Sequence, residues 1–123
     1  MKFQIVLLCL FFLVELNATP FYFKSYDMED GLSNNHVTCC VQDDYGFMWF
    51  GTRDGLNRFD SKKFYTFKSY SSEKGSLMSS YILDLAKSPT GQIWVSTNLG
   101  LQKYDYQTDS FTLIDFTKGI NCY

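Results

Sequence analysis

The sequence predicts an all-β protein, and three observations lead to this prediction. Aromatic residues make up 19% of the chain, whereas alanine, the strongest helix former, occurs only at Ala18 and Ala86. Short runs of apolar or alternating residues are separated by turn residues such as Gly, Asp and Asn. The third observation is an internal repeat, which sets how many strands to expect and how they are grouped.

Length and charge limit the kinds of function to consider. The chain has 123 residues, enough for at most one domain, and 46% of them are hydrophobic. A formal net charge of −2 provides no basic surface, so we expect no nucleic-acid binding by this segment. The many aromatic residues indicate a packed fold rather than a disordered segment.

The N-terminus has the pattern of a secretory signal peptide. Lys2 precedes an apolar run at residues 3–14, and polar residues close this run. The run is shorter than the roughly 18 to 20 apolar residues that a membrane-spanning helix needs. We therefore predict an exported protein with a signal peptide at residues 1–18, cleaved between Ala18 and Thr19.

The sequence repeats itself after about 45 residues, as residues 43–60 and 88–105 show. A second landmark agrees, because FKSY at residues 23–26 returns unchanged at residues 67–70. Chance similarity would not preserve one spacing at several independent places. The recurring pairs are Gly46 and Gly91, Trp49 and Trp94, Thr52 and Thr97, Gly55 and Gly100, Leu56 and Leu101, and Asp60 and Asp105.

The first copy contains four runs that read as strands. Residues 36–42 alternate, and we expect Val37, Cys39 and Val41 on one face. Asp54 followed by Gly55 favours a tight hairpin, because glycine accepts a positive φ at little cost. The strands predicted for this copy are residues 36–42, 47–51, 56–59 and 64–70.

The second copy gives the same four strands, at residues 81–87, 92–96, 100–104 and 110–115. Four short antiparallel strands in each period are typical of a β-propeller blade. We expect a lead-in segment at residues 19–35 with a strand that completes a blade, then a first blade at 36–74 and a second at 75–118. Residues 119–123 would begin a third blade.

The repeat motif of the first copy resembles that of a known family. It reads Asp44-x-Gly46-x-x-Trp49-x-Gly51-Thr52-x-x-Gly55-Leu56-x-Arg58-Phe59-Asp60, preceded by EDGLSNN at residues 29–35. This pattern is similar to the two-component regulator propeller repeat, and the similarity covers roughly residues 21–121. The second copy departs from the pattern, with Pro89 at the turn and Ser96 in place of Gly51.

The resemblance implies the N-terminal part of a periplasmic sensor in a Bacteroides-type hybrid two-component system. In that family the propeller detects oligosaccharides and controls genes for polysaccharide use. The implied partners are an oligosaccharide ligand, further propeller blades and a kinase module. The resemblance also implies a dimeric parent protein anchored in the inner membrane. This chain would itself be non-catalytic, because it contains no segment that reads as a kinase core.

Two other classes remain open at this stage. The same repeat could belong to a secreted propeller enzyme, such as a lyase, glycosidase or quinoprotein, with its active site in other blades. It could also belong to a structural adhesin. Sequence downstream of Tyr123 would separate these classes, because a membrane helix and a kinase core are expected only for the sensor.

The motif residues are expected to have structural rather than chemical roles. Trp49 and Trp94 occupy the same place in each copy, which favours packing between blades over sugar stacking. The turn carboxylates, such as Asp44, Asp60 and Asp105, are expected to accept backbone hydrogen bonds. The motif set is Asp44, Gly46, Trp49, Gly51, Gly55, Leu56, Asp60, Gly91, Trp94, Gly100, Leu101 and Asp105.

Arg53, Asp54 and Asn57 form the best candidate cluster for ligand contact, because they lie at a turn where propeller sites are built. No catalytic residue, metal ligand or cofactor is expected. His36 is the only imidazole, and the cysteines lack the spacing of a zinc site. The odd number of cysteines left after removal of the signal, Cys39, Cys40 and Cys122, does not describe a disulfide framework.

Two blades are too few to close a propeller, since small propellers already need four. We therefore expect an open arc of two adjacent sheets with an uncovered face on each side. Such a chain is expected to associate or to be partly molten when expressed alone.

Overall fold

The structure is a computed structural model that describes residues 20–116. Its strands form two four-stranded sheets with the orders β1-β2-β3-β4 and β5-β6-β7-β8. All the pairings are antiparallel between strands that follow one another in the chain. The predicted all-β fold with two consecutive four-stranded sheets is confirmed. We call the first sheet blade 1 and the second blade 2.

The strand bounds follow the repeat. Blade 1 comprises β1 (Val37–Gln42), β2 (Met48–Thr52), β3 (Gly55–Phe59) and β4 (Phe64–Phe67). Blade 2 comprises β5 (Ile82–Lys87), β6 (Ile93–Thr97), β7 (Gly100–Asp105) and β8 (Ser110–Leu113). A single turn of 3-10 helix, η1 (Met28–Asp30), precedes blade 1.

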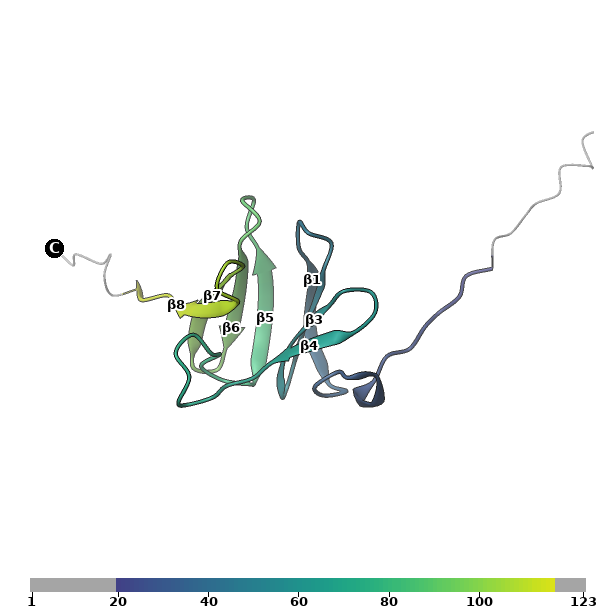
Figure 1. The fold of residues 1–123 in the computed structure, drawn as a ribbon, viewed down its shortest axis with the longest axis horizontal. Helices are drawn as coiled ribbons and strands as arrows, with labels where there is room; N and C mark the ends of the chain where they lie inside the picture. The colour runs from purple at the N-terminus through teal and green to yellow at the C-terminus, as the bar shows by residue number, and fades with distance from the viewer. Residues whose placement is uncertain (1–19, 117–123) are drawn as a thin grey trace, which may run out of the picture.

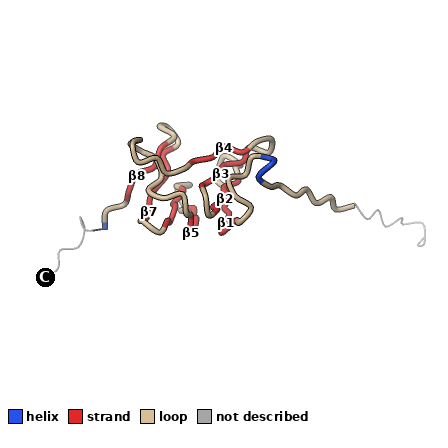
Figure 2. Tube along the Cα trace, turned by 90° about the horizontal axis from the view of Figure 1, so that it is seen from below, coloured by secondary structure: helices blue, strands red, loops and turns tan. Residues whose placement is uncertain are grey.

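The two blades lie side by side, with β1 of the first next to β5 of the second (Figure 1). Figure 2 shows the same pair of sheets from below, with the described ends of the chain leading away on opposite sides. The buried core fills the space between the blades. Its largest fully buried side chains are Trp49, Tyr104, Leu56, Leu77 and Ile82. Hydrophobic burial between two sheets is the main source of stability in such an arrangement.

The fourth strands end earlier than predicted. Residues 68–70 turn away from β3, because the backbone N–H groups of Ser69 and Tyr70 donate to the hydroxyls of Ser80 and Ser76 in the following loop. These bonds replace ladder bonds and end β4 at Phe67. In blade 2, β8 likewise ends at Leu113 rather than at residue 115.

The first strand also differs from its predicted alternation. The register shifts between Val37, which pairs with Thr52, and Cys39, which pairs with Gly51. This bulge places Val37 with Met48 and Phe50 on one face of the sheet, while Cys39 packs against the core on the other. The prediction of Val37 on the face of Cys39 was therefore wrong, because one extra residue reverses a period of two.

The hairpins between the second and third strands are built by a repeated threonine. The Thr52 hydroxyl donates to the carbonyl oxygen of Gly55 at 2.8 Å and accepts the Asp54 N–H at 3.1 Å. Thr97 makes the same two bonds, to Gly100 at 3.1 Å and from Leu99 at 3.2 Å. The glycines take φ values of 140° and 150°, which other residues adopt only under strain.

A side-chain amide on the third strand ties down the segment that leads into each blade. Asn57 accepts the Ser33 N–H at 3.0 Å and donates to the Ser33 hydroxyl at 2.7 Å. In blade 2, Gln102 accepts the Met78 N–H at 2.8 Å and donates to the Ser76 carbonyl at 3.2 Å. Both amides are buried, so these bonds are protected from water.

The predicted signal peptide at residues 1–18, its cleavage site at Ala18 and Thr19, and the start of a third blade at residues 119–123 lie outside the described residues. The described part of the chain has no helix long and apolar enough to cross a membrane.

Candidate functional site

The interface between the two blades holds buried aromatic rings and hydrogen bonds that join the blades. We call it the inner interface. The Trp49 ring of blade 1 stacks on the Phe67 ring, with the ring centroids 5.8 Å apart. It also packs edge-to-face against Tyr104 of blade 2, with the centroids 4.8 Å apart. Phe67 also meets Phe111 at 5.4 Å. Trp49 and Tyr104 are 0% and 1% exposed, so these aromatic contacts form the centre of the core.

Arg58 places a positive charge inside this aromatic cluster. Its guanidinium donates to the Tyr104 hydroxyl at 2.6 Å and lies 3.2 Å from a carboxylate oxygen of Asp109. Tyr104 in turn donates to Asp109. The guanidinium carbon lies 5.6 Å from the ring centres of both Trp49 and Phe67. The cation therefore joins the two blades through hydrogen bonds and ring contacts.

Asp43 is a second polar link between the blades. One carboxylate oxygen accepts the N–H groups of Tyr45 and Phe47, which closes the turn before β2. The other accepts the Trp49 indole N–H at 2.8 Å and the Tyr106 hydroxyl of blade 2 at 3.0 Å. Sequence reasoning gave the motif position to Asp44 and missed this role. A signal was present, because Asp43 is aligned with Ser88, whose hydroxyl accepts the Gln92 N–H.

Asp44 instead lies at the outer end of the turn and forms an ion pair with Lys87 of blade 2. A further bond crosses the interface from the Thr38 hydroxyl to the Ile82 carbonyl at 2.9 Å. Gly51 allows this close approach, because a Cβ there would lie 2.6 Å from a methyl group of Ile82. The glycine of the motif thus makes room for the next blade.

The other motif residues lie at turns or within the sheets. Gly46 and Gly91 have positive φ in the turns before β2 and β6, and Asp60 and Asp105 cap the turns after β3 and β7. Leu56 is fully buried. In blade 2, Trp94 and Leu101 are only partly buried, because they lie on the face turned away from blade 1.

The structure separates the three residues predicted to contact ligand. Arg53 and Asp54 are exposed in the turn between β2 and β3, and Asp54 pairs with Lys68 at 2.7 Å. Asn57 is 0% exposed and its amide is committed to Ser33 and Thr66. Of these three residues, Arg53 and Asp54 are accessible to a ligand from solvent and Asn57 is not. His36 is exposed at the start of β1.

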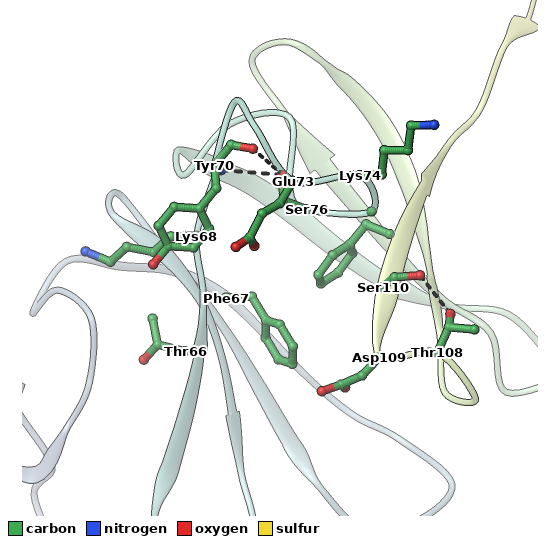
Figure 3. A pocket seen from close by; sticks show the side chains of 12 residues that line it. Thr66, Phe67, Lys68, Tyr70, Glu73, Lys74, Ser76, Thr108, Asp109 and Ser110 are labelled. Carbon is green, nitrogen blue, oxygen red and sulfur yellow. Dashed lines mark hydrogen bonds between the residues drawn. The ribbon is translucent and has the colours of Figure 1, made fainter.

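A surface hollow of about 350 Å³ lies between the outer strands of the two blades (Figure 3). Thr66, Phe67 and Lys68 line it from blade 1, and Asp109 lines it from the β7–β8 turn of blade 2. The loop that joins the blades adds Tyr70 and charged side chains to the rim. Lys68, which lines this hollow, forms an ion pair with Asp54. Asp54, one of the residues predicted to contact ligand, therefore lies beside the hollow.

Several side chains have shifted pKa values. Burial raises the pKa of Tyr104, and its donation to Asp109 acts in the same direction. Burial together with donation to Asp43 raises the pKa of Tyr106. Both phenols therefore stay protonated and act as donors at neutral pH. Burial also raises the pKa of the Cys39 thiol, which makes it a poor nucleophile.

Within residues 20–116, no group of three or more His, Cys, Asp or Glu side chains is arranged to hold a metal ion. At the inner interface the Tyr104 and Tyr106 hydroxyls and the Asp43 carboxylate are hydrogen-bonded within the protein, whereas the buried Nε of Arg58 has no partner among the described residues. The hollow offers hydroxyl, carboxylate and ammonium groups. This arrangement can bind a polar ligand through hydrogen bonds.

Comparisons with known proteins agree with this architecture. Residues 31–54 match the family described as the two component regulator propeller. Over 67 residues, or 53% of the chain, the sequence is 46% identical to Histidine kinase P4 of Formosa agariphila, and this stretch is 5% of that protein.

Two solved structures from B. thetaiotaomicron are similar in fold. The extracellular domain assigned to the hybrid two component system BT3049 is 36% identical, with a TM-score of 0.70, over 79% of this chain. The extracellular domain assigned to BT4673 is 23% identical, with a TM-score of 0.61, over 76% of this chain, and it supports the fold alone. The chain spans 14% of the length of each of these domains.

The relative of 36% identity is an extracellular domain, which is consistent with an extracellular or periplasmic location for the described residues. The repeat, the two sheets and these matches together show that the chain resembles the two component regulator propellers and that its described residues form two four-stranded blades.

Proposed function

We propose that this chain contributes two blades to an extracellular propeller that binds oligosaccharides and signals through a hybrid two-component system. The observation that supports this most strongly is the 36% identity over 79% of the chain to an extracellular domain assigned to such a system. The kinase relative supports the same assignment. In this proposal the chain is exported, its residues 1–18 are removed, and the sensor regulates genes for polysaccharide use.

The surface formed by the Asp54 turn and the neighbouring hollow is the proposed ligand-contacting region. Oligosaccharides are bound through many hydrogen bonds, often with an aromatic ring beside an apolar sugar face. Arg53, Lys68 and Asp109 provide charged hydrogen-bonding groups, and Tyr70 is 54% exposed at the rim of the hollow. The proposed role of this surface is binding, with no bond broken.

The lead-in segment is proposed to complete a further blade. Its residues 23–26 repeat residues 67–70, and Phe67 packs on Trp49 at the inner interface. Phe23, at the equivalent position, is 96% exposed. A large exposed ring at a position that packs against the core in the next copy supports pairing with strands of another blade. The further blades, the kinase module, the dimeric parent and its anchor in the inner membrane belong to the same proposal.

A glycan array followed by calorimetry tests the binding. The exported chain is expected to bind one group of oligosaccharides, and the double variant Arg53→Ala, Asp54→Ala is expected to lose most of that affinity. Ser71→Ala, in the exposed loop that joins the blades, is the matched control. Absence of binding to any glycan contradicts the proposed ligand, and cleavage of a bound glycan contradicts a purely binding role.

Deletion of the gene tests the signalling. Transcripts of polysaccharide-degrading enzymes should lose their response to the oligosaccharide that the chain binds. An unchanged response would favour a structural adhesin.

A further inference from the structure

A second hollow lies where the two blades meet, at the opposite end of β2 from the Asp54 turn. Its volume is about 200 Å³, and the turns before β2 and β6 form its walls. We call it the Tyr45 hollow. The five residues of β2 separate it from the Asp54 turn by about 17 Å, so the two are distinct sites. Its lining residues are Asp44 and Tyr45 from blade 1 and Thr90, Gly91, Gln92 and Tyr106 from blade 2.

Two aromatic rings form one wall of the Tyr45 hollow. The centroids of the Tyr45 and Tyr106 rings lie 4.8 Å apart, with an angle of 52° between the ring planes. The Tyr106 hydroxyl is held by Asp43. Tyr45 is 70% exposed, and its hydroxyl has no hydrogen-bond partner within residues 20–116. Its ring is thus supported on one side by Tyr106 and open to solvent on the other, which suits stacking on an apolar ligand face.

Two acceptor oxygens lie beside this wall. Asp44 pairs with Lys87 through Oδ1, while its Oδ2 accepts no hydrogen bond from residues 20–116. The Nε2 of Gln92 donates to the carbonyl oxygens of Ile93 and Tyr104. These two bonds fix the amide and leave its Oε1 as an acceptor without a donor among the described residues. Acceptors that are held in place before a ligand arrives lose little entropy when they bind it.

The repeat does not require these side chains. Both copies form the same turn, since the Gly46 N–H donates to Asp43 and the Gly91 N–H donates to Ser88. The exposed ring and the carboxylate are nevertheless found in the first copy alone, because Pro89 and Thr90 stand at the positions of residues 44 and 45. The chemistry of the Tyr45 hollow is therefore particular to this pair of blades.

Further blades of the propeller would leave the Tyr45 hollow open. They would pack on the sheet faces of blade 1 and blade 2 that are turned away from the inner interface. Both walls of the hollow belong to the described pair, because Tyr45 of blade 1 lies against Tyr106 of blade 2. The exposure of Tyr45 therefore does not depend on the neighbouring blades.

We propose that the Tyr45 hollow binds one uncharged sugar ring, which stacks on Tyr45 and donates hydroxyl groups to Asp44 and Gln92. A sugar ring combines an apolar face with several neutral donors, and these match the exposed ring and the two free acceptors. The volume of about 200 Å³ is below the roughly 300–1,000 Å³ of pockets for drug-sized ligands, so one ring fills it.

The charges of the hollow favour an uncharged ring over an acidic or amino sugar. Lys87 balances the Asp44 carboxylate, so the pair attracts neither sign strongly. Asp43 beneath the rings already accepts two hydrogen bonds at each carboxylate oxygen. The inference rests on the proposed function for the saccharide class and adds a contact made by other residues.

Fluorine NMR of the complete extracellular domain that carries these blades, labelled with 3-fluorotyrosine, tests the proposal. The Tyr45 signal is the one that is missing from Tyr45→Phe. The neutral probes are the methyl glycosides of glucose, galactose, mannose and xylose, and the charged probes are methyl glucuronide and methyl glucosaminide. At least one neutral probe is expected to shift the Tyr45 signal to saturation, and the charged probes should bind more weakly.

Tyrosine variants show whether the ring itself makes the contact. Saturation-transfer NMR of the bound probe measures their affinity. Tyr45→Phe keeps the ring and should bind like the unchanged protein, whereas Tyr45→Ala should bind about tenfold more weakly. Tyr81→Ala is the matched control, because Tyr81 is exposed at the start of β5 and lines neither hollow. Circular dichroism confirms that each variant is folded.

Three results would overturn the inference: a Tyr45 signal that no neutral probe shifts, tighter binding of a charged probe, or unchanged affinity in folded Tyr45→Ala. The double variant Arg53→Ala, Asp54→Ala separates this site from the proposed ligand surface. A Tyr45 signal that still titrates in the double variant supports the inference whatever the first surface binds. Glycan binding that the double variant loses, with a Tyr45 signal that never moves, supports the proposed function and rejects the Tyr45 hollow.

Discussion

Blade 1 and blade 2 have the same strands and turns but bury their equivalent residues differently. Trp49 is 0% exposed, whereas Trp94 is only partly buried. Ile82 is 0% exposed, whereas Val37 is 42% exposed. The cause is the neighbouring blade, because Trp49 and Ile82 belong to the inner interface while Trp94 and Val37 lie on the two outer faces. The position of a residue in the repeat sets the face of the sheet on which its side chain lies. The side chain is buried only where another blade packs against that face.

The polar contacts differ more than the apolar ones. Apolar residues recur at six equivalent positions of the two copies: Leu32 and Leu77, Val37 and Ile82, Met48 and Ile93, Phe50 and Val95, Phe59 and Tyr104, and Phe64 and Phe111. The bonds that Arg58, Asp43 and Thr38 make to blade 2 have no equivalent among the described residues of the second copy. Apolar packing needs only volume and shape, whereas a hydrogen bond needs two specific groups. The apolar part of the interface therefore recurs in both copies. The hydrogen bonds between blade 1 and blade 2 are specific to this pair.

Replacement of the two tryptophans should separate the blades most clearly. Trp49→Ala is expected to lower the free energy of unfolding by about 3–5 kcal/mol, because a fully buried ring is removed from the core. Trp94→Ala should cost much less in the monomer, since water already reaches this ring. Urea unfolding at a low, non-associating concentration, followed by circular dichroism, measures both. Equal losses would show that Trp94 is covered by the chain itself.

Replacement of the turn residue before the second strand should have the next largest effect. Asp43→Ala leaves the buried Trp49 indole N–H without its acceptor, and each such unpaired group costs about 1–3 kcal/mol. The equivalent Ser88→Ala removes two bonds near the surface, to the Gln92 N–H and the Thr90 hydroxyl, and should cost well under half as much. The same urea titration compares the two variants. A small loss for Asp43→Ala would mean that water replaces the carboxylate.

Asp43 and Ser88 also show which features the sequence alone does not predict. The period, the glycine turns and the alternating runs predict two four-stranded sheets, because hydrophobic spacing and turn chemistry are local properties. The burial of Trp49 follows from the same reasoning. The role of Asp43 does not, because it depends on Tyr106, which the fold brings in from the other blade.

The candidate ligand residues show the same limit. Arg53 and Asp54 are exposed, as expected for a turn, but Asn57 is enclosed by the lead-in segment. The equivalent Gln102 has the same long-range role, and a shared amide in both copies was the signal that could have revealed it. The bulge after Val37 has no local signal in the sequence, because it follows from pairing with Thr52.

The hairpin threonines provide a smaller test in which the blades should behave alike. Thr52→Val and Thr97→Val each remove a hydroxyl that bonds across the turn, and each should cost about 1 kcal/mol. Thr52 also bonds the Ser33 hydroxyl, so its loss should be slightly larger. Thermal unfolding of the two variants gives the comparison. A large difference would show that the turns are not equivalent.

The smallest expected effect comes from the turn carboxylates after the third strands. Backbone N–H groups of Lys63 and Lys62 lower the pKa of Asp60, and the Gln107 N–H lowers the pKa of Asp105. A pKa that is lower in the folded state stabilises the fold above the unfolded value near 4, and this contribution is lost as pH falls through the folded value. Carbon-detected NMR titration should give both carboxyls a pKa below that of a free aspartate. Asp60→Asn and Asp105→Asn should each flatten the loss of stability between about pH 4 and pH 2. Because both groups are exposed, the changes should be small and similar, so a marked difference between the two variants would mean that the neighbouring blade reaches this turn as well.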